Sequence, residues 1–446
     1  MSRDTLVTKF MSRAKDIAEG QNEFLQALEE VAQDVLTIEK ADSALTQARV
    51  MDRLTDPDRV IAFRVVWQND QGEVEINRGW RVQYCNAIGP YKGGLRFHPS
   101  VNLSVLKFLG FEQTFKNALT GLPLGGAKGG ADFDPRGRSD AEIMRFCQAF
   151  MRQLAPYIGP EQDIPAGDIN VSTREIGWMF ASYKAYSQQF NGVLTGKAPS
   201  FGGSLMRTEA TGYGLIYFVQ AMLAKQGEEL SGKRVAVSGK GNVAMHAAEK
   251  AIAEGAHIIS ISDTRGTLYC EDGMSEEALS WARSRKAEGK GIDNPPSSIA
   301  CRFDADKTPW DFDLDIALPC ATQNEVTGKM AETLVDNGTR LLAEGANMPL
   351  TKEAATVLDK AGLVRAPGKA SNAGGVAVSG LEMAQNHQGE FMSADAVDDR
   401  LKTIMTSIHD KIAEEATDGN RINYVKGANI AGYRKVADAV AAMGAI

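Results

Sequence analysis

Cysteine is scarce in this chain of 446 residues, and its five cysteines form no paired motif. They stand far apart, without a CxxC pair or a neighbouring histidine cluster, at Cys85, Cys147, Cys270, Cys301 and Cys320. Such spacing supports neither a disulfide framework nor a zinc site. We therefore expect reduced, mostly buried thiols and no bound metal.

Long apolar runs and an excess of basic residues are also missing. No stretch of about 18 apolar residues occurs, so no membrane span is expected, and the first residues hold no apolar segment of signal-peptide length. The formal net charge is −8, which argues against nucleic acid or an anionic membrane as a partner. These absences favour a cytoplasmic protein whose partners are small molecules.

The hydrophobic pattern changes character near the middle of the chain. The length exceeds what one hydrophobic core usually organises, so two domains are expected. In the first half, strand-like and helical patterns alternate irregularly, with strands at 60–67 and 73–87 and helices at 101–119 and 139–158. After a long helix at 203–226, the second half alternates strands with helices, which predicts a parallel sheet with crossover helices. The expected strands are 234–239, 257–262, 314–319 and 340–345, and the expected helices are 242–254, 275–288, 325–336 and 351–361.

These patterns predict an α/β protein of two domains. The first would cover residues 1–200, and a Rossmann-like dinucleotide-binding domain would cover 201–424. The Gly- and Ser-rich segment 193–204 is the expected hinge, and a C-terminal helix at about 425–446 is expected to return to the first domain.

A nucleotide-binding fingerprint opens the second half. VAVSGKGNVA (235–244) has the form strand–GxGxxA–helix, with Gly239, Gly241 and Ala244 at the three small positions. The first glycine permits the tight turn, the second lets the backbone approach a pyrophosphate, and the small third residue lets helix and strand pack closely. The surrounding strand–helix series is the context in which this motif predicts dinucleotide binding.

The residues after the second strand point to two different cofactors. Asp263 lies 24 residues after the first glycine, where an acid usually binds a ribose 2′-hydroxyl and favours NAD. Arg265 follows at once, and Arg283, Arg285 and Lys286 lie on the next expected helix. These cations suit the 2′-phosphate of NADP, although they also fit a solvated basic helix face.

Lysines stand within Gly-rich loops of the first half, in GPYKGGLRFHP (89–99) and GLPLGGAKGGADFDP (121–135). A third lysine, Lys116, shares a helix face with Gln113. Two of Lys92, Lys116 and Lys128 can hold a dicarboxylate, while the third, among cations and partly desolvated, acquires a lowered pKa. Asp168, in a PAGD turn, adds a carboxylate, although an isolated Asp after Gly is more often a turn or cap residue.

Several segments between about residues 77 and 440 resemble, in the same order, the short hexameric glutamate dehydrogenases of bacteria and fungi. They include GPYKGGLRFHPSVN, KFLGFEQTFKNALTGLPLGGAKGG, PAGD, GGSLMRTEATGYG, ALPCATQNE, AEGANMP and NAGGVAVSGLEM. The resemblance implies a substrate and oligomerisation domain with a mixed sheet, a Rossmann-like domain, and an active site in the cleft between them. It also implies a cytoplasmic homohexamer that uses NADP, with NAD as the alternative.

The resemblance assigns roles at matching positions. Lys128 would be the low-pKa lysine that activates water, and Asp168 would exchange protons with the substrate nitrogen. Lys92 and Ser379 would hold the side-chain carboxylate of glutamate. The rest of the substrate pocket would comprise Gln113, Lys116, the backbone of Gly167, Thr195, Asn372 and Val376. On the cofactor side the resemblance adds Thr211, Asn242, Val243, Thr322, Gln323 and Asn347. They join the cofactor contacts expected from the fingerprint and the charges after it, which are Gly239, Gly241, Asp263, Arg265 and Lys286.

The implied reaction is a reversible oxidative deamination. Hydride passes from the α-carbon of L-glutamate to the nicotinamide, and water attack on the resulting imine releases ammonia and 2-oxoglutarate. The segments around 378–383 and 425–433 lie too close together for the antenna insertion of the animal enzymes, so purine-nucleotide control of that kind is not expected.

The chain departs from the family pattern at two places. Ala127 stands where the family commonly has glycine, and Asn170, Ser172 and Thr173 replace three glycines near Asp168. Two other functions compete with glutamate dehydrogenase. One is a related dehydrogenase for leucine, valine or phenylalanine, which would carry an apolar residue in place of Lys92. The other is a nucleotide-binding scaffold or regulatory protein without catalysis, against which the presence of Lys128 and Asp168 argues.

Overall fold

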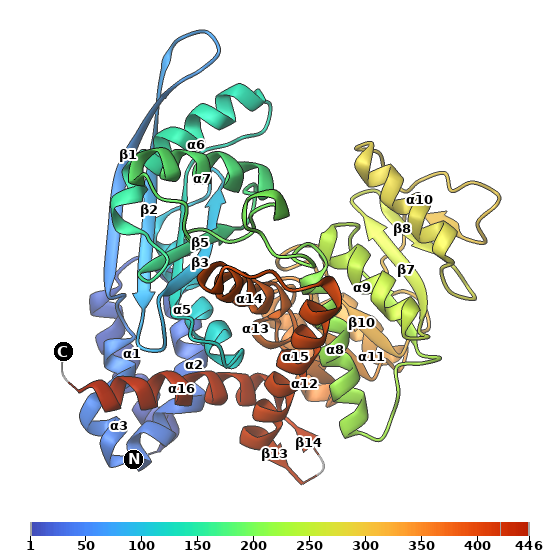
Figure 1. The fold of residues 1–446 in the computed structure, drawn as a ribbon. Helices are drawn as coiled ribbons and strands as arrows, with labels where there is room; N and C mark the ends of the chain where they lie inside the picture. Colours follow the sequence, from blue (N-terminus) through green and yellow to red (C-terminus); the bar gives the residue numbers. More distant parts are fainter. Residues whose placement is uncertain (1, 420, 445–446) are drawn as a thin grey trace. The chain divides into compact units, whose positions relative to one another are not determined.

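The computed structural model describes residues 2–419 and 421–444. By its contacts the chain forms two compact units, each with its own principal sheet (Figure 1). The first unit comprises Met1–Leu205, Val378–Val397 and Asn429–Ile446, and the second comprises Met206–Ala377 and Asp398–Ala428. The expected α/β architecture, with a mixed sheet in one unit and a Rossmann-like sheet in the other, is confirmed.

The units differ from the expected ranges at three places, of which two are short: residues 201–205 belong to the first unit and residues 425–428 to the second. The segment Val378–Val397 was placed in the second domain, but it belongs to the first unit. A buried ion pair helps to fix it there, because Lys197 Nζ lies 3.0 Å from Glu382 Oε1 and neither side chain is exposed. Asn386 Nδ2 also donates to the carbonyl oxygen of Gly202 at 2.7 Å. These contacts link residues some 185 positions apart, which local patterns do not reveal.

The first unit is built on a five-stranded mixed sheet in the order β1-β2-β4-β3-β5. β2 runs antiparallel to β1 and β4, whereas β3 runs parallel to both β4 and β5. The carboxyl ends of β3, β4 and β5 therefore lie at the same edge. The strands are β1 (Arg59–Gln68), β2 (Val74–Cys85), β3 (Tyr91–Phe97), β4 (Gly126–Ala131) and β5 (Asp163–Gly167). The helices wholly within this unit are α1 (Arg3–Ile17), α2 (Asn22–Ala41), α3 (Ser43–Ala48), α4 (Val50–Arg53), α5 (Leu103–Leu119), α6 (Asp140–Leu154) and α7 (Thr173–Ser187).

An aromatic core fixes β3 against α6. Ser139 and Glu142 form a capping box that starts α6, and its apolar face then recurs at helical spacing. Phe146 and Phe150 of that face lie 5.1 and 5.3 Å, centroid to centroid, from Phe97 of β3. Leu95 belongs to the same core. Because side chains alternate along a strand, the residue between them, Arg96, is directed to the opposite face.

The second unit holds a seven-stranded sheet in the order β12-β11-β10-β6-β7-β8-β9. The five strands from β12 to β7 are parallel, and β8 and β9 add an antiparallel edge. The strands are β6 (Arg234–Val237), β7 (His257–Asp263), β8 (Gly266–Tyr269), β9 (Arg302–Asp304), β10 (Ile316–Leu318), β11 (Leu341–Ala343) and β12 (Val364–Ala366). The helices wholly within it are α8 (Ala210–Lys225), α9 (Asn242–Ala253), α10 (Glu276–Ala287), α11 (Gly328–Asp336), α12 (Lys352–Ala361) and α13 (Gly368–Ser371), and a small ribbon pairs β13 (Thr417–Asp418) with β14 (Arg421–Ile422).

Three long helices contain points at which the chain passes between units. They are α14 (Gly374–Gln388), α15 (Ala394–Ala416) and α16 (Tyr424–Met443). One expected helix begins later than predicted. It is α8, which starts at Ala210 and not at residue 203. Met206 adopts a φ of 60°, a left-handed conformation that a right-handed helix cannot contain.

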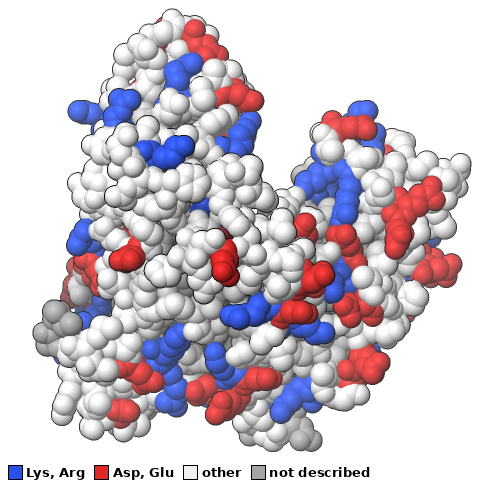
Figure 2. All heavy atoms as spheres, viewed as in Figure 1, with Lys and Arg blue, Asp and Glu red and all other residues white. Residues whose placement is uncertain are grey.

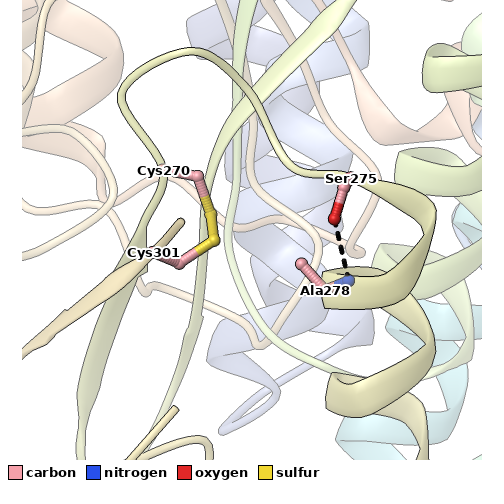
Figure 3. Close-up of a disulfide and its surroundings, with 4 residues drawn as sticks. All are labelled: Cys270, Ser275, Ala278 and Cys301. Atoms are coloured by element: carbon pink, nitrogen blue, oxygen red, sulfur yellow. Dashed lines mark hydrogen bonds between the residues drawn. A yellow bond between two sulfur atoms is a disulfide. The ribbon is translucent and has the colours of Figure 1, made fainter. Parts of the chain in front are cut away.

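A disulfide between Cys270 and Cys301 contradicts the expectation that all thiols are reduced. β8 and β9 pair in antiparallel register with Tyr269 opposite Arg302, so the two cysteines just beyond this pair face each other, with Cα atoms 4.3 Å apart. Figure 3 shows the bond near the start of α10, where Ser275 Oγ accepts from the Ala278 N–H. Neither strand was predicted, so the spacing of 31 residues gave no sign of the pairing. The other three cysteines are free and buried.

Charged side chains of both signs are interspersed over the face drawn in Figure 2. Neither sign forms a continuous stripe there, in contrast to the basic stripes typical of nucleic-acid-binding surfaces. Within residues 2–419 and 421–444, none of the helices has the length and apolar character needed to cross a membrane.

Candidate active site and cofactor site

A cluster of charged side chains lies at the edge of the first sheet where β3, β4 and β5 end. Lys128 of β4 has its Nζ 3.0 Å from Asp168 Oδ1. Arg96 of β3 donates from Nε to Asp168 Oδ2 at 2.6 Å. Asp168 directly follows β5 and thus holds one cation with each of its oxygens. The structure therefore brings together the two predicted catalytic residues and adds a third group, Arg96.

The glycines of the KGG segment make this close approach possible. A Cβ atom on Gly94 would lie 2.7 Å from the carbonyl oxygen of Gly167 and 2.9 Å from Cβ of Asp168. A Cβ atom on Gly93 would lie only 1.6 Å from the carbonyl oxygen of Ala127. All three distances are shorter than real Cβ contacts, so β3 can pack against β4 and the Asp168 turn only if both positions are glycine.

Burial and charge shift the pKa values of this cluster. Burial lowers the pKa of Lys128 because the ammonium form is poorly solvated; the Arg96 charge adds to this, and Asp168 opposes it. Burial acts in the opposite direction on Asp168, but Lys128 and Arg96 outweigh it and hold its pKa below the usual range. The cluster thus combines a lysine whose pKa is lowered with a carboxylate whose pKa is also lowered.

Other predicted substrate residues of the first unit lie on β3, α5, β5 and α14. Lys92 is 1% exposed, and its carbonyl oxygen accepts from Asn117 Nδ2 at 3.0 Å. Asn117 Oδ1 in turn accepts from Gln113 Nε2 at 2.7 Å, which connects α5 to β3. Lys116 is half-buried on the same helix, Gly167 ends β5, and Ser379 is buried on the part of α14 that belongs to this unit.

Thr195 supplies a buried polar atom to this unit. Its backbone N–H donates to the carbonyl oxygen of Pro165 at 3.0 Å, which places it next to β5. Within the described part of the chain, its Oγ1 is buried and has no hydrogen-bond partner. A buried hydroxyl in that state is costly unless a ligand completes it. This observation fits the predicted substrate role of Thr195.

The fingerprint residues of the second unit have the geometry that a pyrophosphate requires. Gly239 has a φ of 83° in the turn after β6. Gly241 is the N-cap of α9 and makes no side-chain cap, and a Cβ atom at Gly241 would point into open space. The first amides of α9, beginning with Asn242 and Val243, thus remain available to an anion at the positive end of the helix. The residues present fit a dinucleotide.

Some of the remaining predicted contacts of the second unit are packed together, and two others lie in an exposed loop. Asn372 Nδ2 donates to Asn347 Oδ1 at 2.9 Å, so a predicted substrate residue and a predicted nicotinamide residue are joined. On α14, a Cβ atom on Gly375, the residue before Val376, would lie 2.6 Å from Thr211 Oγ1. The start of α14 therefore lies close to α8. Thr322 and Gln323 are exposed in the loop after β10. Asn372 and Val376 thus belong to the unit that carries the fingerprint, whereas the other predicted substrate residues belong to the first unit.

Comparison with known families settles the class of the protein. Residues 202–444 match the family described as Glutamate/Leucine/Phenylalanine/Valine dehydrogenase, and residues 57–185 match the Glu/Leu/Phe/Val dehydrogenase dimerisation domain. The chain belongs to this dehydrogenase family. The resemblance noted from the sequence motifs is thereby confirmed.

Individual relatives cover the whole chain. The NADP-specific glutamate dehydrogenase of Psychrobacter sp. (strain TAD1) is 51% identical over 98% of this chain and 99% of its own length. The NAD-specific glutamate dehydrogenase of Bacteroides fragilis is also 51% identical, over 99% of this chain and 100% of its own length. The crystal structure of Plasmodium falciparum glutamate dehydrogenase superposes with a TM-score of 0.96 at 43% identity, covering 100% of this chain and 96% of that one.

Sequence reasoning missed two charged residues that the dehydrogenase fold brings into these sites. Arg96 lies inside the GPYKGGLRFHP segment, and its alternation with the apolar residues Leu95 and Phe97 was the available signal. Lys240 stands between the two fingerprint glycines, and its Nζ lies 3.0 Å from Asp263 Oδ2. A lysine within the phosphate-binding turn was the signal for this second residue.

The departures from the family pattern near Asp168 have a structural explanation. Asn170 adopts a φ of 59°, a left-handed conformation that glycine adopts freely and asparagine tolerates better than most residues. Its Nδ2 donates to the carbonyl oxygen of Phe97 at 2.9 Å. Ser172 is the N-cap of α7 and forms a capping box with Glu175. Thr173 begins α7, and Ala127 is buried in β4; no contact of either side chain explains its presence.

The Asn170→Gly variant is expected to be less stable than the wild type by about 1 kcal/mol. It loses the hydrogen bond to Phe97 and gains chain entropy in the unfolded state. Denaturant titration measures the change. Asn324, an exposed residue with a φ of 56°, provides the control Asn324→Gly. An equal loss of stability in both variants would show that the Phe97 contact contributes nothing.

Proposed function

We propose that this protein is a glutamate dehydrogenase that interconverts L-glutamate with 2-oxoglutarate and ammonia by hydride exchange with NADP. The observation that carries the proposal is the buried Lys92 on β3, beside the strand that supplies Lys128. A buried cation suits the second carboxylate of glutamate. Beside the apolar side chain of a neutral amino-acid substrate, the same buried charge would cost free energy. The names of the full-length relatives support the same reaction.

In the proposed mechanism, charged groups orient the substrate and two of them move protons. Lys92 and Ser379 bind the side-chain carboxylate, while Gln113, Lys116 and the Gly167 backbone bind the α-carboxylate. Neutral Lys128 accepts a proton from the water that attacks the imine carbon. When Lys128 is neutral, Asp168 has lost one of its two counter-charges and becomes a better base, so it can exchange a proton with the substrate nitrogen.

The cofactor supplies the hydride chemistry when bound, and the chain orients it. The amides at the start of α9 would hold the pyrophosphate. Lys286 Nζ donates to Asn242 Oδ1, which places a cation beside this helix end. Thr211, Thr322, Gln323 and Asn347 are the proposed contacts farther along the dinucleotide.

Purified protein tests the proposal directly. Oxidation of NADPH and of NADH is followed in parallel, with 2-oxoglutarate and ammonia both present or each omitted. Oxidation that needs both substrates, and that is faster with NADPH, is the expected result. No oxidation of either cofactor would favour the scaffold function, and preference for NADH would replace NADP by NAD. Faster reaction with the 2-oxo acids of leucine, valine or phenylalanine would favour the neutral amino-acid dehydrogenase.

The proposal includes a cytoplasmic homohexamer assembled through the first unit. Support for self-association comes from the match of residues 57–185 to a dimerisation domain. The edge strand β1 and its neighbour β2 also expose four large apolar side chains, which are Val60, Val66, Val74 and Ile76. Such a surface is typical of an interface between copies of a chain. Light scattering should give about six times the chain mass of 48.1 kDa, and a monomer mass would contradict the assembly.

The Arg96→Gln variant is expected to move the acid limb of the pH profile to higher pH. Arg96 lowers the pKa of Lys128, so its removal raises that pKa, and the neutral amine forms only at higher pH. The pKa of Asp168 also rises, but from below its usual range. The dependence of kcat/KM for glutamate on pH, measured for the variant and the wild type, gives the pH of the acid limb in each. An unmoved limb would show that Arg96 does not tune Lys128.

A further inference from the structure

Asp263 does not have the surroundings of an acid that binds a ribose. Its Oδ1 accepts from the Arg265 N–H at 2.8 Å, and its Oδ2 accepts from the Ile292 N–H at 3.0 Å. Lys240 Nζ lies 3.0 Å from the same Oδ2, and the Asp263 side chain is only 5% exposed. A carboxylate engaged in this way has little capacity left for ribose hydroxyls, yet it keeps its negative charge.

Lys240 occupies a position at which that charge matters. It stands between Gly239 and Gly241, in the turn that precedes α9, and its Nζ reaches Asp263, the last residue of β7. Figure 1 shows α9 and β7 in the same unit. Besides its ion pair with Asp263, it donates to the carbonyl oxygen of Lys290. It therefore links the phosphate-binding turn, the acid at the end of β7 and the loop after α10.

We propose that Lys240 determines the cofactor preference, because its ion pair with Asp263 cancels the repulsion between this carboxylate and a 2′-phosphate and thereby admits NADP. The inference deepens the proposed use of NADP and rests on it. A 2′-phosphate carries about two negative charges at neutral pH, and at contact distance an uncompensated carboxylate would repel it strongly. The hydroxyl of NAD experiences no such repulsion, so the ion pair discriminates between the cofactors.

The other cations near this loop already have partners of their own. Arg265 Nη1 donates to Asp293 Oδ1 at 2.8 Å, and Arg285 Nε donates to the Gly291 carbonyl oxygen at 2.7 Å. Arg283 pairs with Glu249. The same loop is closely packed, since a Cβ atom on Gly291 would lie 2.3 Å from Asp293 Oδ1. Lys240 is the cation among these that contacts Asp263 through its side chain.

Calorimetric titration of the full-length protein with 2′,5′-ADP and with ADP tests the proposal without catalysis. Lys240→Gln is expected to weaken 2′,5′-ADP about tenfold and to change ADP by less than about twofold. Asp263→Asn is expected to keep or strengthen 2′,5′-ADP binding. In the Asp263→Asn background, Lys240→Gln should weaken it by no more than about twofold. Lys290→Gln, on the same loop with its amine paired to Glu288, is the matched control and should bind both ligands as the wild type does.

Three outcomes would overturn the proposal. Equal weakening of both ligands by Lys240→Gln would make Lys240 a pyrophosphate ligand or a structural residue. Unchanged binding of both would show that the ion pair selects nothing. A full tenfold effect of Lys240→Gln in the Asp263→Asn background would mean that Lys240 acts on the phosphate without Asp263. Failure of the proposed NADP use is distinguishable, because there the wild type itself would bind ADP at least as tightly as 2′,5′-ADP.

Discussion

The Asp168→Asn variant is expected to lose about 10²- to 10⁴-fold in kcat, the usual contribution of a general acid–base group. The amide keeps the shape of the side chain but can neither accept a proton nor balance two cations. Lys128, 3.0 Å away, loses the neighbour that raises its pKa, so it is neutral at lower pH than in the wild type. The loss of rate must therefore come from proton exchange at the substrate nitrogen and not from a protonated Lys128.

Steady-state kinetics with glutamate and with 2-oxoglutarate plus ammonia measure this loss. KM for glutamate should change much less than kcat, because Asp168 is not a proposed carboxylate ligand. Asp359→Asn is a matched control, since Asp359 also binds an arginine with both oxygens, with distances of 2.6 and 2.9 Å to Arg365. That variant should retain full activity. An Asp168→Asn enzyme with near-normal kcat would remove Asp168 from the mechanism.

The Lys92→Leu variant is expected to lose about 30- to 4,000-fold in kcat/KM for glutamate. The estimate follows from a buried charged contact worth roughly 2–5 kcal/mol, with each 1.4 kcal/mol giving a factor of ten. Leucine leaves the substrate carboxylate unpaired in a buried site, but it suits a five-carbon amino acid without a second carboxylate. Norvaline oxidation should therefore rise relative to glutamate oxidation. Glutamate use should be weakened far more than folding.

Lys107 provides a control for the burial of lysine as such. It is 3% exposed on α5 and pairs with Asp56 at 2.8 Å. Lys107→Leu should leave the ratio of glutamate to norvaline oxidation unchanged. Kinetics with both amino acids, together with thermal melting, separate the outcomes. Unaltered glutamate kinetics in Lys92→Leu would contradict both the role of Lys92 and the choice of glutamate as substrate.

Local sequence patterns predicted those helices and strands whose turn and helix signals lie in adjacent residues. The strand–GxGxxA–helix motif gave β6, the turn and α9 within a residue or two, since turn and helix chemistry reside in adjacent residues. Strand–helix alternation gave four of the five parallel strands of the second sheet, and β12 was not predicted. The antiparallel edge escaped prediction because neither the fingerprint motif nor the strand–helix alternation marks β8 and β9. The disulfide that depends on their register was missed for the same reason.

The candidate site was predicted in its residue types but not in its connections. Lys128 and Asp168 were chosen from their motifs, and the structure places them in contact. The role of Arg96 depends on the register in which Leu95 lies opposite Gly167, which no local pattern encodes. The two conflicting indications at Asp263 and Arg265 had a similar cause. Asp263 favours NAD and Arg265 favours NADP, and the residue that bears on this conflict, Lys240, lies 23 positions before Asp263 in the sequence but beside its carboxylate in the structure.

The last helix also affects how the chain can fold as it is made. Asn429 Nδ2 donates to Asp34 Oδ2 at 2.8 Å, and Tyr433 donates its hydroxyl proton to Glu39. These bonds join α16 to α2 across 395 and 394 positions. At ribosomal rates of about 5–20 residues per second, α2 waits roughly 20–80 s for this partner. The first unit, although most of its residues are synthesised early, is completed only after α16 has left the ribosome.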